Sequence, residues 1–574
     1  MLCLFLAACG PSRSLLRESA DIVDHARPHA LTCDRVDRCA VASPLLDLAG
    51  DGRHRVISLE GGESSLLMRI HLIRAARETI DLQSYIFDTD VSGQLVLDEL
   101  LAAARRGVRV RVLLDQLFSL DDPALLAYLS RAHANFEIKL YNPTFGEART
   151  QKLEFAASLF CCFWRFNQRM HNKLLLVDGA AGLTGGRNVQ DRYFDWDREF
   201  DFRDRDVLLI GPEAAEMQSS FDTYWAYDRS VSAHALGDVA RRVVDDIAKP
   251  PSVPGDAAQL PRVKALLAEA VDADAIAARF GPLLFEVERA QYFWDRPSKP
   301  YQRETPAERD TTRQIKAMIA GTRVSLWLQT PYLVLSRNAR ALFQDLADRE
   351  APPRMVVSTN SLAATDAFFV YALSHKYKRM YVRRFGFEIH EWKPYPADAA
   401  WRLDAWDWLV EGIAEAKPAD GPRIGMHAKS LVIDDHIVMI GSHNFTPRSA
   451  DLNTESGVIV WDQTFARHIR AEIERDIAPG NAWTIARRQR SPVIGLFSGT
   501  MSGISESLPI FDLWPWRYTT SYELNEGCDP KPPAHARFFE CYHEVGDFPE
   551  AASPLKRLPT ALVTAFGLGL EPIL

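Results

Sequence analysis

Hydrophobic positions early in the chain follow a helical period and then a strand period. In SSLLMRIHLIRAARETIDLQSYIF, residues 64–87, apolar side chains recur three and four positions apart before the pattern changes to strand alternation. LVLDELLAAARRGVRVRVLLDQ, residues 95–116, repeats this order as an amphipathic helix, a stop at Gly107 and a buried strand. Helices that alternate with strands predict a mostly parallel or mixed sheet with helices on its faces.

The same order returns in the second half of the chain. TTRQIKAMIAGTRVSLWLQTPYLV, residues 311–334, and RALFQDLADREAPPRMVVSTNS, residues 340–361, each read as a helix followed by a strand. The sequence therefore predicts an α/β fold with mixed sheets. We expect two α-β-α halves that are related by a pseudo-twofold axis and share one active site.

Shifts in composition give the expected boundaries. A leader and linker over residues 1–45 precede the first half over 46–247, a Pro-rich linker and polar excursion over 248–310, the second half over 311–475 and an apolar extension over 476–574. The extension contains SLPIFDLWPWRY and LPTALVTAFGLGLEPIL, which either pack across the core or face a membrane.

A polar motif occurs once in each half. MHNKLLLVDGAAGLTGGRN, residues 170–188, and MHAKSLVIDDHIVMIGSHN, residues 426–444, share His, Lys, Asp and Asn at a constant offset of 256 positions. Each copy reads as strand, turn and strand, and alternation along a strand places its His and Lys on one face. A repeat kept for packing alone would preserve apolar positions, whereas this repeat preserves polar ones, which indicates chemistry.

The repeated residues suit the transfer of a phosphoryl group. His171 and His427 can act as nucleophile and general acid/base, with a covalent phosphohistidine as the intermediate. Because nearby cations and amides can stabilise charge on the phosphate oxygens, this chemistry needs no metal or other cofactor. The groups expected in that role are Lys173, Lys429, Asn188 and Asn444.

Four carboxylates accompany the motif. Glu199 and Glu455 continue the same 256-residue register, and we expect each to hold an imidazole by its unreactive nitrogen. Asp178 and Asp434 belong to the catalytic motif but lie five residues beyond the lysines. This odd spacing turns them away from the lysine face, so we expect them to brace the strand-turn framework.

The doubled motif resembles the signature of the phospholipase D superfamily, over roughly residues 46–475. Within it, YIFDTDVSG, FRDRDVLLIGP and QTPYLV are most similar to bacterial cardiolipin synthases of the C type. The resemblance implies phosphatidyl transfer: a donor phospholipid loses its head-group alcohol, and the hydroxyl of another lipid attacks the phosphatidyl-histidine. It also implies His171 as the nucleophile and His427 as the acid/base.

Two other activities would use the same residues. A hydrolytic phospholipase D differs only in admitting water, and a phosphodiesterase or nuclease is a further alternative. The net charge of −9 disfavours nucleic acid as a partner, because such binding depends on neutralising phosphates. We expect phospholipid substrates, namely phosphatidylglycerol and phosphatidylethanolamine, at a membrane surface.

The beginning of the chain bears on its location. MLCLFLAACG resembles a bacterial lipoprotein signal in which Cys9 would be lipidated, although a chance match or an upstream start is the alternative. No later stretch of 18 or more apolar residues predicts a spanning helix. These features favour the bacterial cell envelope, with a lipid anchor on the periplasmic side.

Apart from Cys3 and Cys9 in the leader, the cysteines fall into three pairs. Cys33 with Cys39, and Cys528 with Cys541, are close enough in sequence for local disulfides. Cys161 and Cys162 are expected to be core residues. The surrounding SLFCCFWRFNQRM either lines an acyl channel or packs as an ordinary segment.

Overall fold

The computed structural model describes residues 11–31, 40–248, 250, 260–299, 310–489 and 518–550. The chain forms two compact units. Unit 1 contains Met1–Trp196, Arg205–Thr311 and Leu452–Ile459, and unit 2 contains Asp197–Asp204, Thr312–Asp451 and Val460–Leu574. Each unit therefore includes one short segment from the other half of the sequence.

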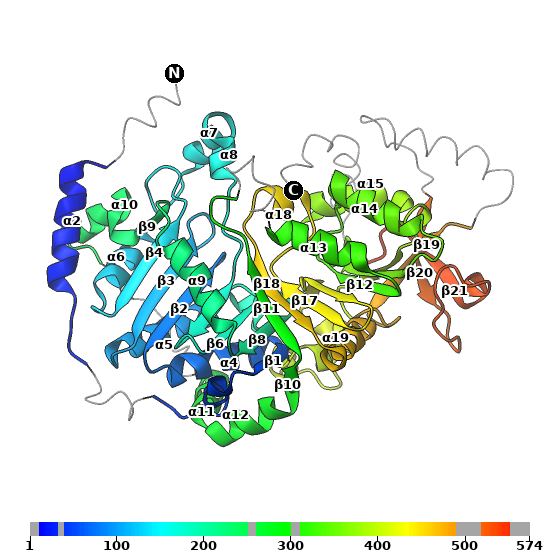
Figure 1. The fold of residues 1–574 in the computed structure, drawn as a ribbon, viewed down its shortest axis with the longest axis horizontal. Coiled ribbons are helices and arrows are strands. Elements are labelled where there is room, and N and C mark those ends of the chain that lie inside the picture. Colours follow the sequence, from blue (N-terminus) through cyan, green and yellow to red (C-terminus); the bar gives the residue numbers. More distant parts are fainter. Residues whose placement is uncertain are drawn as a thin grey trace. The chain divides into compact units, whose positions relative to one another are not determined.

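Unit 1 is built on a nine-stranded mixed sheet in the order β10-β1-β8-β6-β5-β2-β3-β4-β9. Its centre is parallel, since β3 pairs in parallel with both β2 and β4, while β5 pairs antiparallel with β2 and β6. Figure 1 shows β2, β3 and β4 side by side in blue to cyan. The strands are β1 (His54–Leu59), β2 (Thr79–Ser84), β3 (Arg109–Asp115), β4 (Phe136–Tyr141), β5 (Leu174–Val177), β6 (Ala181–Gly185), β8 (Asp206–Ile210), β9 (Ser230–Ser232) and β10 (Leu284–Val287).

Helices of unit 1 cover this sheet. Helix α4 (Gly62–Ala75) is buried on almost every side, because it packs on β1 and β5 and also against the helices α5 (Val91–Arg105) and α11 (Pro261–Val271). Its apolar residues therefore lie on more than one face of the helix, and the buried Arg69 and His71 are hydrogen-bonded to Asp206 and Ser43. Other helices of the unit are α2 (Arg13–Ala26), α6 (Pro123–Arg131), α7 (Lys152–Cys161), α8 (Phe163–Phe166), α9 (Ala214–Trp225), α10 (Gly237–Val244) and α12 (Ala273–Phe280).

Unit 2 repeats the central topology. Its strands run β17-β16-β12-β13-β14-β19-β20-β21, with β13 parallel to β12 and β14 and the other pairs antiparallel. The strands are β12 (Ser325–Gln329), β13 (Arg354–Asn360), β14 (Glu388–Trp392), β16 (Ser430–Ile433), β17 (Ile437–Gly441), β19 (Ala482–Arg487), β20 (Thr519–Leu524) and β21 (Tyr542–Gly546). The longer helices are α13 (Asp310–Gly321), α14 (Arg337–Ala347), α15 (Phe368–Arg383) and α19 (Gln463–Asp476).

The order β17-β16-β12-β13-β14-β19 of unit 2 matches β6-β5-β2-β3-β4-β9 of unit 1 in sequence and direction. This correspondence confirms the predicted α/β class with two halves of mixed sheet. The pseudo-twofold relation and the shared active site stay predictions.

The two exchanged segments are tied into their host units by backbone hydrogen bonds. In unit 2, β7 (Phe200–Arg203) pairs in parallel with β15 (Arg423–Met426). In unit 1, Thr454 forms a parallel bridge with Met170. Both segments thus lie beside the residues that lead into a His-Lys motif.

Several sequence boundaries differ from the structure. Residues 260–299, expected as an excursion, form α11, α12, β10 and β11 (Arg289–Trp294), and β10 extends the sheet of unit 1. Strand β19 falls in the region expected as an apolar extension, yet it occupies the position in its sheet that β9 has in unit 1.

The remaining expectations concern cysteines and termini. Cys528 and Cys541 form the expected disulfide, with their Cα atoms 5.5 Å apart. Cys161 is exposed and Cys162 half-buried, so the expectation of two core residues is wrong. None of the helices in the described ranges combines the length and apolar character that a membrane crossing requires. Cys9, the pair Cys33 and Cys39, and most of the two apolar C-terminal stretches lie outside the described residues.

Candidate active site

The two His-Lys pairs occupy equivalent positions in their units. His171 and Lys173 are buried immediately before β5, and His427 and Lys429 are buried immediately before β16. β5 runs antiparallel to β2, and Gln83 near the end of β2 pairs with Leu174. The motif therefore lies at the carboxyl edge of the parallel strands, where α/β sheets commonly place their sites.

Polar side chains at that edge fix the backbone next to each histidine. In unit 1, Asp115 at the end of β3 accepts a hydrogen bond from Met170 N at 2.9 Å and pairs with Arg169 at 3.2 Å. In unit 2, Asn360 at the end of β13 accepts from Met426 N and donates to Met426 O, both at 2.7 Å. The backbone of the residue before each histidine is thus held by a side chain at the end of a parallel strand, β3 in unit 1 and β13 in unit 2.

His171 is oriented by a carboxylate from an exchanged segment. Its Nδ1 lies 2.7 Å from Oε2 of Glu455, which is fully buried. The segment is held in turn by Asp295, whose Oδ2 accepts from Glu455 N at 3.0 Å and from Lys299 Nζ at 2.7 Å. With Nδ1 donating to the carboxylate, Nε2 carries the lone pair and is the nucleophilic atom.

Tyr85, the residue after β2, contacts both His171 and Lys173. It packs edge-on to the His171 imidazole with ring centroids 4.8 Å apart, and Lys173 Nζ lies 5.1 Å from its centre. Lys173 also donates to the carbonyl oxygen of His171 at 2.8 Å. The aromatic ring and the carbonyl hold the lysine cation beside the imidazole.

His427 has the same arrangement in unit 2, again with an exchanged carboxylate. Its Nδ1 lies 2.5 Å from Oδ2 of the fully buried Asp204. Lys429 Nζ lies 2.8 Å from the same nitrogen and also donates to the His427 carbonyl. One nitrogen cannot both donate to Asp204 and accept from Lys429. Because Asp204 is closer, we assign a proton to Nδ1 of His427, which donates it in a hydrogen bond to the Asp204 carboxylate.

Burial, followed by the Lys429 charge, lowers the pKa of His427, while Asp204 opposes both by stabilising the imidazolium. The net shift is downward, so the isolated site holds a neutral His427 at neutral pH. The segment that carries Asp204 is held in unit 2, because the neighbouring Arg203 pairs with Asp476 at 3.2 Å.

The expectation that Glu199 orients a histidine is wrong. Its side chain is exposed, and the segment places Asp204 on His427 instead. Asp204 lies 16 positions after Asn188, whereas Glu455 lies 11 positions after Asn444, so the first half contains five extra residues. Asp204 and Glu455 are followed, at the same distance, by the apolar runs VLLI and VIV. These runs align Asp204 with Glu455, and they are the sequence signal that the constant 256-residue register obscured.

Asp178 and Asp434 brace the framework, as expected from their spacing. Asp178 follows β5 and accepts hydrogen bonds from the backbone N–H groups of Arg77, Glu78 and Thr79 at 2.8–2.9 Å. Asp434 follows β16 and does the same for Arg323, Val324 and Ser325. Asp178 therefore fixes the start of β2, and Asp434 fixes the start of β12. Both contacts lie at the far end of the motif strand from its histidine.

Because Asp178 braces the backbone, we expect its replacement to lower the stability of the fold rather than to act on the catalytic step directly. Asp178→Ala should lower the free energy of unfolding by about 2 kcal/mol, because three backbone donors lose a charged acceptor. Asp178→Asn keeps an acceptor oxygen and should lose less. Denaturant unfolding of both variants tests the order, and an alanine variant as stable as wild type would contradict the role.

The two asparagines are held by local contacts. Asn188 is buried and its Oδ1 accepts from Ile86 N at 3.2 Å, which leaves the Nδ2 group as its donor. The Asn444 carbonyl accepts from Thr330 Oγ1 at 2.8 Å, and its N–H donates to Ser449 Oγ at 3.1 Å. Their role in binding phosphate stays a prediction.

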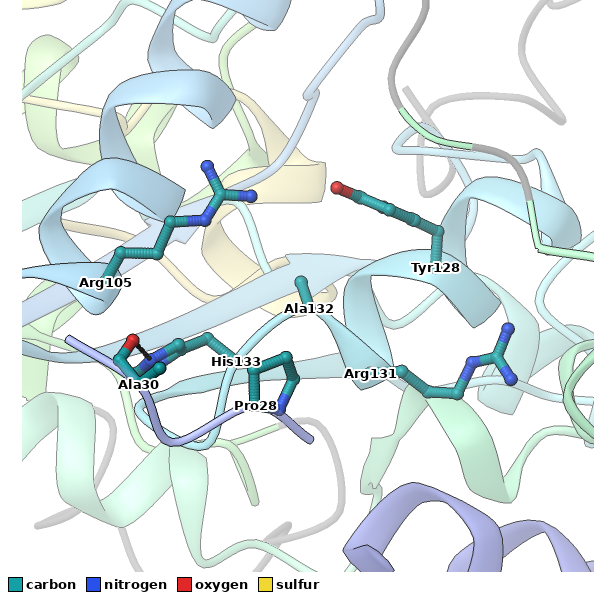
Figure 2. Close-up of a pocket in the computed structure, with 7 residues that line it drawn as sticks. All are labelled: Pro28, Ala30, Arg105, Tyr128, Arg131, Ala132 and His133. Atoms are coloured by element: carbon teal, nitrogen blue, oxygen red, sulfur yellow. Dashed lines mark hydrogen bonds between the residues drawn. The ribbon is translucent and has the colours of Figure 1, made fainter. Parts of the chain in front are cut away.

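A pocket of about 500 Å³ in unit 1 is separate from the motif (Figure 2). Arg105 and His133 on its wall precede β3 and β4, so it lies at the amino edge of the strands. Arg131 pairs with Asp246 at 2.9 Å, and His133 accepts from Asn135 N at 3.1 Å. Arg105 and Arg131 end their helices, where cations complement the helix dipole, so these groups have structural roles.

Groups of three or more His, Cys, Asp and Glu side chains that could hold a metal ion do not occur among the residues that the structure describes.

Comparisons with known proteins agree with the repeated site. The family described as "Cardiolipin synthase, PLD-like domain" matches residues 69–225 and 315–477, which include both motifs. Cardiolipin synthase C of Escherichia coli K12 is 32% identical over 437 residues, 75% of this chain and 86% of its own. An uncharacterized protein of Helicobacter pylori J99 is 31% identical over 424 residues, 73% of this chain and 78% of its own.

Among solved structures, one that matches the chain is the crystal structure of phosphatidylserine synthase from Haemophilus influenzae Rd KW20. It covers 86% of this chain and 98% of its own, with 12% identity and a TM-score of 0.49.

Proposed function

The chain belongs to the family of phospholipase D-like cardiolipin synthases, and from that premise we propose that it is a phosphatidyltransferase that makes cardiolipin-type phospholipids. The observation that carries the proposal is the doubled imidazole–carboxylate pair, His171 with Glu455 and His427 with Asp204. An oriented imidazole is suited to attack phosphorus in one copy and to transfer a proton in the other.

The proposed reaction has two balanced steps. Nε2 of His171 attacks the phosphorus of the donor phospholipid, the bond to the head-group oxygen breaks, and His427 gives that oxygen a proton. The product is a phosphatidyl-His171 and a released alcohol. Neutral His427 then removes the proton from an acceptor hydroxyl, whose oxygen attacks phosphorus and displaces His171.

The lowered pKa of His427 fits the second step and sets a condition for the first. As a base it must be neutral, which its burial and the Lys429 charge favour. As an acid it must be protonated, and a bound phosphodiester anion raises an imidazole pKa. We therefore propose that His427 takes up a proton from solvent when the anionic donor binds, and then gives that proton to the leaving alcohol.

We propose that both histidines serve one active site. Each histidine depends on a carboxylate from the other half of the sequence, which a pair of independent sites would not require. Lys173, Lys429 and the amides of Asn188 and Asn444 would then stabilise the phosphate oxygens, in place of a metal ion.

The proposed substrates are phosphatidylglycerol and phosphatidylethanolamine at the membrane surface of the bacterial envelope, with lipidated Cys9 as an additional anchor. A covalent phosphatidyl-histidine at such a surface meets many lipid hydroxyls and little water, which protects it from hydrolysis. Transfer to a lipid alcohol should therefore outrun release of phosphatidic acid.

The product ratio tests this proposal. Purified full-length protein is supplied with labelled phosphatidylglycerol in vesicles, and cardiolipin and phosphatidic acid are separated and counted. We expect cardiolipin as the main product at saturating acceptor. Predominant phosphatidic acid would identify a hydrolytic phospholipase D, and a His171→Ala preparation provides the background.

A further inference from the structure

Helices α7 and α8 display large apolar side chains to solvent. The exposed fractions are 78% for Leu153, 50% for Phe155 and 57% for Trp164, and Cys161 between them is exposed too. Figure 1 shows the two helices packed together beyond the ends of the strands of unit 1. Three large apolar groups gathered on two short helices are unusual for a surface that faces only water.

The base of this helical pair is fixed to the unit. Phe166 is buried and contacts the Phe155 ring edge-on, with centroids 5.4 Å apart. Asn142, which follows β4, donates to the carbonyls of Arg165 at 2.8 Å and Gln168 at 2.9 Å. The exposed apolar groups therefore lie on an anchored projection.

Residues 152–166 contain Lys152 and Arg165 against Glu154, a net charge of +1, in contrast to the chain as a whole. Lys152 and Arg165 are exposed, while Arg149, which precedes α7, is exposed and pairs with Asp121 at 3.8 Å. The acidic residue of α7, Glu154, accepts from the backbone N–H of Gln151 at 2.8 Å and caps the helix. With a net charge of −9 overall, the chain offers an anionic surface an attractive contact here.

We propose that α7–α8, residues 152–166, docks the enzyme on an anionic phospholipid bilayer by inserting Leu153, Phe155 and Trp164 at the interface. Apolar and aromatic side chains flanked by cations are the composition that binds such interfaces. The inference rests on the proposed function and assigns the surface through which the enzyme reaches its lipids. Trp164 lies seven residues before His171, so docking keeps the nucleophile's Cα atom within roughly 25 Å of that bilayer contact.

Vesicle binding tests the docking surface directly. Leu153→Glu/Trp164→Glu is compared with Trp401→Glu/Ile413→Glu, which alters apolar residues of unit 2 that are 53% and 47% exposed. Co-sedimentation uses phosphatidylcholine vesicles with and without phosphatidylglycerol. We expect wild type and the control to bind the anionic vesicles and the α7–α8 variant to bind at least roughly tenfold more weakly.

A charge variant and a second substrate separate the possible failures. Lys152→Glu/Arg165→Glu should also weaken binding, most strongly at low salt. Turnover of a short-chain phosphatidylglycerol that remains monomeric should be unchanged in both α7–α8 variants, which also shows that they are folded. If wild type does not turn over the short-chain phosphatidylglycerol, the proposed function is refuted, while the vesicle-binding result still tests the docking surface.

Three outcomes would overturn the docking proposal. They are wild-type binding by both α7–α8 variants, equal weakening in the control variant, and a wild-type dimer that the α7–α8 variants convert to a monomer. The last result would assign the projection to a second copy of this chain.

Discussion

His171→Ala and His427→Ala should each reduce phosphatidyl transfer by at least about 10⁴-fold. The loss is large because the two residues act on the same phosphorus in the proposed site, one as nucleophile and one as proton donor and acceptor. Both imidazoles are buried and hydrogen-bonded to buried carboxylates, so neither is placed as a surface histidine would be. Steady-state transfer rates on vesicle phospholipid give the comparison.

An activated donor separates the two roles. A phosphatidyl p-nitrophenol needs no proton on its leaving group, so His427→Ala should recover part of the first step and release p-nitrophenol in a burst. His171→Ala should show no burst, because it lacks the atom that forms the covalent bond. Recovery in His171→Ala instead would reverse the assignment, and near wild-type rates in either variant would refute the single site.

Asp204→Asn and Glu455→Gln should each reduce the transfer rate by roughly 10²–10⁴-fold, whereas Glu199→Gln should leave it unchanged. An amide no longer stabilises the imidazolium and can hold the wrong tautomer, although it fills the same space. Glu199 is the matched control because its side chain is exposed and lies in the same short segment as Asp204. A large loss in Glu199→Gln, with none in Asp204→Asn, would restore the pairing that the constant register predicts.

The direction of the pH effect is a second readout of the Asp204 variant. Asp204 raises the pKa of His427 against burial and the Lys429 charge. Without it the pKa falls further, so the step that needs protonated His427 should lose rate at a lower pH than in wild type. In the plot of transfer rate against pH, the alkaline limb measured with a natural donor should move to lower pH in Asp204→Asn. The alkaline limb measured with the activated donor should stay in place.

Much of this architecture could be predicted from local pattern. The change from helical to strand period in residues 64–87 and 311–334 corresponds to α4 with β2 and to α13 with β12. The bracing role of Asp178 was also expected from the sequence, and the structure places the residue in the turn after β5, where it binds the backbone at the start of β2.

What could not be predicted depends on contacts distant in sequence. The pairing of His427 with Asp204 spans 223 positions, and the sheet position of β10 depends on its contact with β1. A polar register of 256 residues suggested Glu199, but the first half contains five added residues before Asp204, and only the apolar runs VLLI and VIV after the two acids keep the correct alignment. The exposure of Cys161 was likewise misjudged, since apolar neighbours indicate a core only when something covers them.

The exchange of residues 197–204 and 452–459 between the units carries an evolutionary implication. An unduplicated ancestor with one half would contain a catalytic imidazole and an acid on a segment that cannot serve it within the same copy. Such a chain completes its site only by lending the segment to a second copy and borrowing the same segment in return. Gene fusion then replaces an association that depends on concentration with a covalent one. Once fused, the two copies of the segment can diverge independently, and in this chain one copy carries Asp204 where the other carries Glu455.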